Sequence, residues 1–162
     1  MCHRCDYPEL LEKSGLGATP HRLKILEIIG NNNSPLSAQE IYNTLNRMDD
    51  INRVTVYRIL ERLVENGLID RISSGGRSFR YGLAPNENHE PHAHFYCTAC
   101  GNLECLNPES LRLDMAPIQR TFPGKVRNVQ IRLDGLCKRC LLKRKDLAPE
   151  APRRTRHPGP HR

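Results

Sequence analysis

Two Cys-x-x-Cys pairs constrain the fold of this 162-residue chain more than any other sequence feature. The first pair is Cys97 and Cys100, and the second pair is Cys137 and Cys140. Four thiolates held by two tight turns match the tetrahedral coordination that Zn²⁺ prefers. The 36 residues between the pairs must therefore form elements that return the second pair to the first. The spacing predicts a structural zinc site in the second half of the chain.

The alternative for these cysteines is a redox-active pair. Such a pair needs an exposed thiol of lowered pKa at the start of a helix, and we expect neither pair to precede a long helix. The chain has seven cysteines, and an odd number argues against a complete set of disulfides. The opening residues MCHRCDYPEL lack the apolar core of a signal peptide, and no segment approaches the ~20 apolar residues that span a membrane. We therefore expect a cytoplasmic protein with reduced, metal-binding thiols and no membrane partner.

The composition favours two small lobes over one large core, because hydrophobic residues make up 38% of the chain and aromatic residues only 5%. The formal net charge of +7 suggests a polyanionic partner, but this charge is unevenly distributed. Residues 143–162 hold seven Lys or Arg against two acids, whereas residues 1–142 carry a net charge of only +2. We interpret residues 146–162 as a disordered basic tail, so DNA binding must be argued from the helices.

The first half of the chain has the order of a winged helix-turn-helix. Apolar residues at helical spacing predict helices over about 7–15, 20–30, 37–45 and 53–66. Thr19 before Pro20 marks one helix start, Ser37 and Glu40 form a capping box, and Gly67 ends the last helix. Two strands then supply the wing, at 68–72 and 78–83, with a turn at 73–76.

The second half follows a polar linker, APNENHEP, and mixes short strands with one helix. We expect a helix from Pro108 to about Phe122, bent at Pro117, and strands at 94–97, 103–106 and 126–133. The second cysteine pair closes the ordered region. The chain is thus expected to be an α+β protein, with an N-terminal winged helix and a small C-terminal α/β domain around the cysteine site.

A second cluster of metal-binding residue types lies near the linker. His92 and His94 are two apart on an expected strand, so both imidazoles point to one face, and Cys105 lies on the opposing strand. His89 precedes His92 by three residues. Two imidazoles and a thiolate suit Zn²⁺, although each residue alone is more often a surface histidine or a buried apolar cysteine. Because its histidines titrate and it lies near the linker, we interpret this cluster as a sensor that loads and empties.

The helix expected at 53–66 has the features of a DNA-recognition helix. A recognition helix places its N-terminal residues against base edges, where Arg58 can read guanine and Tyr57 can contact a phosphate or a thymine methyl. The alternative is an ordinary solvated face, since Glu61 and Glu65 share the helix. The predicted DNA contacts are Thr55, Tyr57, Arg58 and, from the helix that begins at residue 20, Arg22.

Five segments together resemble the ferric uptake regulator family of metal-dependent repressors, over about residues 10–142. They are Thr-Pro-His-Arg-Leu-Lys-Ile-Leu at 19–26, Ser-Ala-Gln-Glu-Ile-Tyr at 37–42, Val-Thr-Val-Tyr-Arg at 54–58, His-Ala-His-Phe-Tyr-Cys-Thr-Ala-Cys-Gly at 92–101 and Cys-Lys-Arg-Cys at 137–140. The resemblance implies three parts: a winged-helix DNA-binding domain at 1–84, a hinge at 85–91 and a zinc-binding dimerisation domain at 92–145. It also implies a homodimer on double-stranded operator DNA, with metal at the hinge setting the spacing of the two DNA-binding lobes.

The chain departs from the family's iron-sensing pattern at four positions, where Pro35, Gly82, Cys105 and Val129 stand in place of His, Glu, Glu and His. Lost carboxylates and a gained thiolate shift the preference from iron to zinc, so the chain is most similar to the zinc uptake regulator branch. That branch's wing cysteine is missing, because Tyr81 and Gly82 fill the region, and Cys105 is expected to replace it. The resemblance implies a regulatory Zn²⁺ site of Asp70, His92, His94 and Cys105, with His89 as the reserve ligand.

These residues predict a metal-responsive repressor of metal uptake genes that uses zinc, with Fe²⁺ the less favoured regulatory metal. An iron- or peroxide-sensing repressor of the same family is the alternative. A remote alternative is a zinc hydrolase, in which His92 and His94 hold a catalytic water and the base is Glu87, Glu90 or Glu104. No HExxH-like pattern accompanies them, so we expect neither an enzyme nor a small-molecule substrate. Near the chain start, a further potential ligand group is interpreted as incidental: Cys2, His3 and Cys5.

Overall fold

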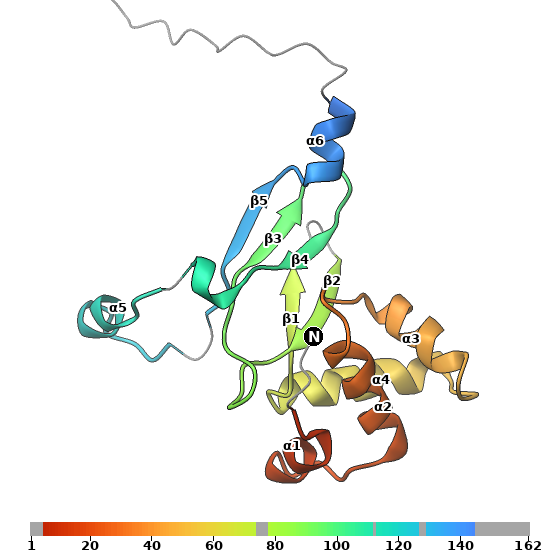
Figure 1. Ribbon diagram of the computed structural model, residues 1–162. Coiled ribbons are helices and arrows are strands. Elements are labelled where there is room, and N and C mark those ends of the chain that lie inside the picture. Colours follow the sequence, from red (N-terminus) through yellow and green to blue (C-terminus); the bar gives the residue numbers. More distant parts are fainter. Residues whose placement is uncertain (1–4, 74–77, 112, 127–128, 145–162) are drawn as a thin grey trace, which may run out of the picture.

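The computed structural model describes residues 5–73, 78–111, 113–126 and 129–144, which form two lobes (Figure 1). Within these ranges the N-terminal lobe consists of helices and a two-stranded sheet, and the C-terminal lobe is built on a three-stranded sheet. No helix in the described ranges combines the length and the apolar character needed to cross a membrane.

The N-terminal lobe is a winged helix. Its helices are α1 (Tyr7–Lys13), α2 (Pro20–Gly30), α3 (Ala38–Asn46) and α4 (Arg53–Glu65). Its wing is the antiparallel hairpin of β1 (Ile69–Ser73) and β2 (Phe79–Leu83). The predicted order of helices followed by a hairpin is confirmed, while residues 74–76 of the predicted turn lie outside the described ranges.

Local sequence signals explain where these helices begin. The Ser37 hydroxyl accepts a hydrogen bond from the backbone N–H of Glu40, and the Glu40 carboxylate accepts one from the backbone N–H of Ser37. These two bonds complete the predicted capping box of α3. Asn52 caps α4 through its side-chain oxygen. Thr19 occupies the N-cap position of α2 without a side-chain cap hydrogen bond, so the start of α2 depends on Pro20.

The core of the N-terminal lobe lies between α2, α3, α4 and β1. Its fully buried side chains include Ile25, Leu26, Ile41, Leu45, Leu60, Leu63 and Ile69. Full burial of such an aliphatic side chain contributes about 1.5–3 kcal/mol relative to leaving it exposed. This core fixes the orientation of α4, so that its opposite face, with the predicted DNA contacts, is turned towards solvent.

The C-terminal lobe is built on a sheet of strand order β4-β3-β5. β3 (His94–Cys97) pairs antiparallel with β4 (Leu103–Cys105) and parallel with β5 (Arg132–Gly135). α6 (Lys138–Arg144) follows β5 and lies at the end of the sheet where β3 and β5 finish (Figure 1). The expected α+β class, with a winged helix followed by a small C-terminal α/β unit, is confirmed.

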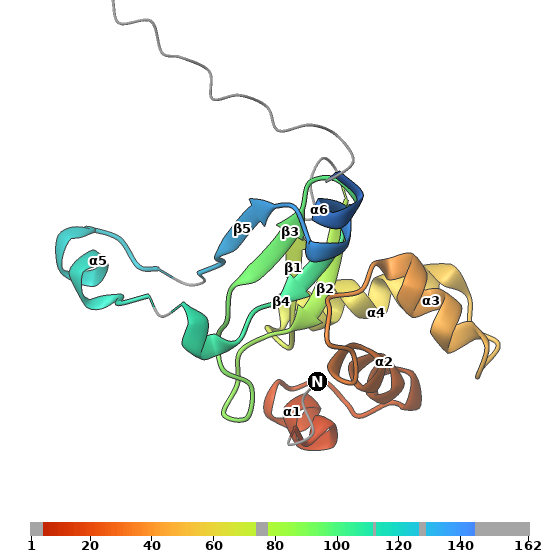
Figure 2. The same cartoon turned by 45° about the horizontal axis from the view of Figure 1, so that its top comes forward.

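The long helix predicted for the C-terminal lobe is wrong. Instead of one helix from Pro108 to Phe122, the chain forms a 3-10 turn, η1 (Pro108–Ser110), and a separate helix, α5 (Ala116–Thr121). A proline inside a helix removes a backbone hydrogen bond and clashes with the preceding turn. Pro117 is therefore accommodated at the start of α5, which projects away from the sheet (Figures 1 and 2).

The last predicted strand is also misplaced. Alternation of Val129, Ile131 and Leu133 favours a strand over 126–133, but β5 begins only at Arg132 and continues to Gly135. Residues 126 and 129–131 are not in a strand, and residues 127–128 lie outside the described ranges. The position of β5 is fixed by its pairing with β3, which places Gly135 opposite Cys97. The end of β5 therefore lies beside the first cysteine pair.

The two lobes meet where the wing approaches β5. Arg132 Nη1 donates to the backbone oxygen of Ser73 at 3.1 Å, and Gln130 Nε2 donates to the backbone oxygen of Arg71 at 3.3 Å. Figures 1 and 2 both show the wing running beside the C-terminal sheet. The linker between β2 and β3 is therefore flanked by contacts that join the lobes directly.

Candidate metal centres

The first candidate centre is a cage of four cysteines at one end of the C-terminal sheet. Cys97 ends β3, Cys100 lies in the following turn, Cys137 directly precedes α6 and Cys140 lies in its first turn. The four sulfur atoms all lie within 4.8 Å of one another, and the Cys100 and Cys137 sulfurs are 3.9 Å apart. Zn–S bonds of about 2.3 Å in a tetrahedron place the sulfurs roughly 3.8 Å apart. The four predicted ligands therefore converge at a spacing that fits zinc.

The electrostatics of the cage also fit a cation. The backbone N–H of Cys137 donates to Cys97 Sγ at 3.3 Å, and this bond is the main reason that the pKa of Cys97 is lowered to about 6. Hydrogen bonds with the thiols of Cys137 and Cys100 raise the pKa of Cys140 to about 12. Four thiolates this close cannot all ionise unless a positive charge is placed among them. A divalent ion supplies that charge, which deprotonates the coordinating thiols.

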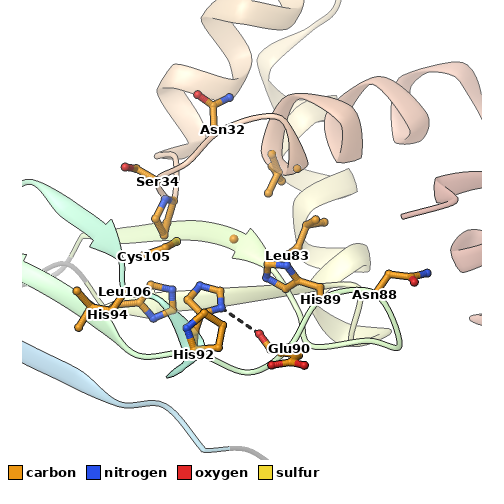
Figure 3. Close-up of a pocket in the computed structure, with 15 residues that line it drawn as sticks. Asn32, Ser34, Leu83, Asn88, His89, Glu90, His92, His94, Cys105 and Leu106 are labelled. Atoms are coloured by element: carbon orange, nitrogen blue, oxygen red, sulfur yellow. Dashed lines mark hydrogen bonds between the residues drawn. The ribbon is translucent and has the colours of Figure 1, made fainter. Parts of the chain in front are cut away.

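The second candidate centre is a cavity of about 430 Å³ between the two lobes (Figure 3). Donor atoms of His92, His94 and Cys105 all lie within 4.8 Å of one another on its C-terminal side. The opposite wall comes from the N-terminal lobe and includes Asn32, Ser34, Pro35 and Gly82. Three residue types that bind zinc are thus gathered at the point where the lobes face each other.

His92 is oriented as a metal ligand would be. Its Nδ1 lies 3.1 Å from the backbone oxygen of Glu90, which assigns the proton to Nδ1. Its Nε2 is buried and has no hydrogen-bond partner among the described residues. Metal-binding histidines characteristically donate one ring N–H to a carbonyl or carboxylate and present the other nitrogen to the ion. A buried, unpaired ring nitrogen is otherwise costly, so the unpartnered Nε2 fits a role as a metal ligand.

The protonation states of the other two donors differ. Burial, followed by the nearby His92 and His89, lowers the pKa of His94 to about 4, so its ring is neutral at physiological pH. Cys105 lines the cavity, although part of the residue is exposed to solvent. Burial of its thiol by the surrounding protein raises the pKa of Cys105 above the ordinary value. His94 can therefore bind metal without losing a proton, whereas Cys105 must release one.

The structure does not bring Asp70 into this group. Asp70 lies in β1 opposite Gly82, is half-buried, and is absent from the described cavity lining. Burial raises the pKa of Asp70, and the charge of His92 partly offsets that shift. His89, the reserve ligand, does line the cavity, with its ring centroid 5.0 Å from that of His92. Of the incidental group near the chain start, Cys2 and His3 lie outside the described residues.

The predicted DNA contacts lie on the solvent face of α4, with one exception. Thr55, Tyr57 and Arg58 are exposed near the start of the helix. Arg22 is half-buried, and its Nη1 donates to the backbone oxygen of Gly17 at 2.8 Å, so it also braces the turn before α2. Arg53, the first residue of α4, is also exposed here, and its guanidinium lies 5.6 Å from the Tyr57 ring centroid.

Comparison with known proteins gives one family and a consistent fold. The chain matches the ferric uptake regulator family over residues 13–133. The ferric uptake regulation protein of Bacillus subtilis (strain 168) is 29% identical over 132 residues, which cover 80% of this chain and 89% of that protein. The Vibrio cholerae ferric uptake regulator structure is 27% identical with a TM-score of 0.63, covering 82% of this chain and 100% of that one. A zinc uptake regulator complexed with zinc and DNA has a TM-score of 0.60 over 85% of this chain and 91% of its own, and at 23% identity this likeness concerns the fold alone.

The cage generates the first testable prediction. Cys97→Ser should remove the cage metal and unfold the C-terminal lobe, because structural zinc contributes on the order of 10 kcal/mol to the folding of small zinc domains. Metal analysis and circular dichroism of the purified full chain measure both effects. Cys105→Ser, which alters a cysteine outside the cage, should retain the cage metal and the folded lobe. A folded Cys97→Ser protein without metal would contradict the assignment.

The second prediction concerns pH and the cavity site. The Cys105 thiol is protonated in the metal-free protein near neutral pH and must become a thiolate in the complex, so raising the pH strengthens binding. The apparent affinity for Zn²⁺ at this site should rise by about tenfold per pH unit between pH 7 and 8, because His94 is already neutral. Competition titrations against a chelator measure the slope. Cys105→Asp, whose carboxylate is already ionised, should bind with a shallower slope, and an equal slope would contradict the assignment.

Proposed function

This chain belongs to the ferric uptake regulator family of metal-dependent transcription regulators, and we propose that it is a zinc-dependent repressor of metal uptake genes. The convergence of His92, His94 and Cys105 in the cavity between the lobes is the observation that carries the proposal. These residues would hold the regulatory ion, and the four-cysteine cage would hold a structural zinc.

The donor set supports zinc over iron. Thiolate and imidazole are the ligands of borderline-soft ions, whereas carboxylate-rich sets suit harder ones. Two positions at which the family's iron sensors carry His and Glu are Pro35 and Gly82 here, and both line the cavity without offering a donor side chain. The cavity therefore lacks two of the donor side chains, one imidazole and one carboxylate, that the family's iron sensors carry at these positions.

The position of the cavity supports a switch. One wall belongs to the DNA-binding lobe, with the loop after α2 and the strand β2, and the other belongs to the linker, β3 and β4. An ion held here would bind some orientations of the two lobes more tightly than others. Such a difference in affinity is what a ligand needs in order to shift the protein from one orientation to another. Because coupling is reciprocal, operator DNA should in turn tighten metal binding.

A homodimer on double-stranded operator DNA completes the proposal. The C-terminal lobe exposes a set of large apolar side chains, and such a surface usually marks an interface: Leu111, Leu113, Ile118, Phe122, Val126, Val129 and Leu133. A second copy of the chain is the partner that we propose for it. Exposed Thr55, Tyr57 and Arg58 at the start of α4 are the proposed DNA contacts, with Arg22 in support.

The hydrolase alternative gains no support from the site. Of the three glutamates considered as bases, only Glu90 is among the described residues that line the cavity. Figure 3 shows the Glu90 carboxylate on the side of the imidazoles that is away from Cys105. The relatives identified by sequence are regulation proteins, so we propose a regulator without a small-molecule substrate.

The regulatory assignment is tested by Cys105→Ala. This variant should keep the cage metal and the dimer, but should lose zinc-dependent binding to promoter DNA, because one of three converging donors is gone. Gel retardation at buffered free Zn²⁺ and at buffered free Fe²⁺ measures the response and compares the two metals. Ser110→Ala, an exposed change on the neighbouring turn, serves as the control. Wild-type zinc sensitivity in Cys105→Ala would show that Cys105 is only a thiol of the fold.

The DNA-reading assignment is tested by Arg58→Ala. Loss of a bidentate contact to guanine should cost roughly 1–3 kcal/mol of discrimination at one base position, with metal content unchanged. Arg62→Ala is the matched control, because Arg62 is also exposed on α4 but pairs with Glu65 one turn later. Fluorescence anisotropy with operator and random duplexes measures the difference. If the two variants lose discrimination equally, or if Arg58→Ala loses none, Arg58 does not read the base sequence.

A further inference from the structure

We propose that His89 is the fourth ligand of the cavity site, so that the bound ion closes the hinge directly and does not tether the wing through Asp70. This inference rests on the proposed role of His92, His94 and Cys105 as metal ligands. It changes the mechanism of coupling, because it draws every ligand from the linker and the C-terminal lobe.

The cavity leaves room for one further protein donor. His92, His94 and Cys105 supply three donor atoms, and zinc in a closed protein site takes four. Other side chains with donor atoms around the cavity are Asn32, Ser34, Asn88, His89 and Glu90. His89 is the imidazole among them, and imidazole is the donor in this set that suits zinc best.

The rings of the three histidines form a continuous row. The ring centroids of His89 and His92 are 5.0 Å apart and nearly perpendicular, and those of His92 and His94 are 4.9 Å apart. Figure 3 shows the three rings side by side along one wall of the cavity, with Cys105 near His94 and His92. The buried, unpartnered Nε2 of His92 lies in the middle residue of this row. His89 itself is outside the three-donor group, so its ligation requires its ring to turn towards the ion.

The backbone holds His89 in a defined place. The N–H of Asn86 donates to the oxygen of His89 at 2.9 Å, and the N–H of His89 donates to the oxygen of Asn86 at 3.0 Å. The Asn86 side chain accepts from the N–H of Asn88 at 2.9 Å, which closes the same turn. His89 is therefore carried by a compact turn within the linker. Ligation of His89 would fasten this turn to β3 and β4.

The competing carboxylates are placed less well. Asp70 is on the wing strand β1 and, like His89, is outside the three-donor group, but unlike His89 it is not among the described cavity-lining residues. Glu90 is exposed, and its backbone oxygen already contacts His92 Nδ1. A metal that used Asp70 would tie the wing to the C-terminal lobe, whereas one that used His89 would take all its ligands from the linker and the C-terminal lobe.

This arrangement implies an indirect route from metal to DNA. The loop after α2 faces the linker across the cavity through Asn32, Ser34 and Pro35. When the linker turn is fastened by His89, this loop meets a fixed surface, and the DNA-binding lobe is oriented by packing. The switch would then depend on the order of the hinge and not on a ligand contributed by the lobe that moves.

The test uses the full-length protein with its cage filled by Zn²⁺ and Co²⁺ added as the probe of the second site. Four-coordinate Co²⁺ with a thiolate ligand gives intense visible bands and a sulfur-to-metal charge-transfer band. His89→Ala should weaken Co²⁺ binding roughly 10- to 100-fold, at least as much as loss of a residue that merely supports a ligand, and should reduce the visible intensity. Asp70→Asn and the neighbouring control Asn88→Ala should bind as the wild type does. The inference is overturned if Asp70→Asn weakens binding and His89→Ala does not.

Two further measurements separate the possible failures. Cadmium–nitrogen couplings in isotopically labelled wild-type protein count the imidazoles on the ion without any mutation, and three are expected, while two would overturn the role of His89. Cys105→Ala tests the proposed function itself, because it should abolish the charge-transfer band. Loss of that band in Cys105→Ala together with wild-type binding by His89→Ala would reject His89 alone. Retention of the band in Cys105→Ala would reject the site and the inference together.

Discussion

The return of the second cysteine pair to the first is the constraint on which the C-terminal lobe depends. Four sulfur donors lie within 4.8 Å of one another, and their mutual repulsion as thiolates is relieved only by a cation among them. That cation would hold β5 beside β3, because Cys97 ends one strand and Cys137 follows the other. The lobe has little else to stabilise it, since its buried apolar side chains among the described residues are few: Ala93, Cys97 and Leu103.

The strand register that the cage requires also assembles the second centre. His94 and Cys105 are direct partners across β3 and β4, and such partners have their Cβ atoms about 4.5–5.5 Å apart. His92 precedes β3 by two residues, so the alternation of side chains brings it to the same face as His94. The donors of the proposed regulatory site, at one end of β3, are therefore organised by a sheet that a metal in the cage would stabilise at the other end. We infer an order of dependence, in which the structural ion makes the regulatory site possible.

The features that the sequence predicts are those carried by residues close together in the chain or by ligand chemistry. The capping box of Ser37 and Glu40, the helices followed by a hairpin and the two cysteine pairs belong to this class. The prediction of one helix bent at Pro117 was wrong, because a bent helix and the separate elements η1 and α5 have the same hydrophobic pattern in the sequence. The start of β5 depends on parallel pairing with a strand more than thirty residues earlier, which periodicity does not encode. The placement of Asp70 and His89 relative to the three converging donors depends on how the linker folds, and no local pattern specifies that.

The two centres differ in a way that a switch requires. The cage lies wholly within the C-terminal lobe, where Cys97 is fully buried and receives an amide hydrogen bond from Cys137. Rotation of the DNA-binding lobe leaves those contacts unchanged, so the cage ion has no differential affinity for lobe orientations. The cavity has walls from both lobes, and the same rotation alters its shape and the free energy of an ion inside it. Of the two candidate sites among the described residues, we therefore assign the coupling of metal concentration to DNA binding to the second and a structural role to the first.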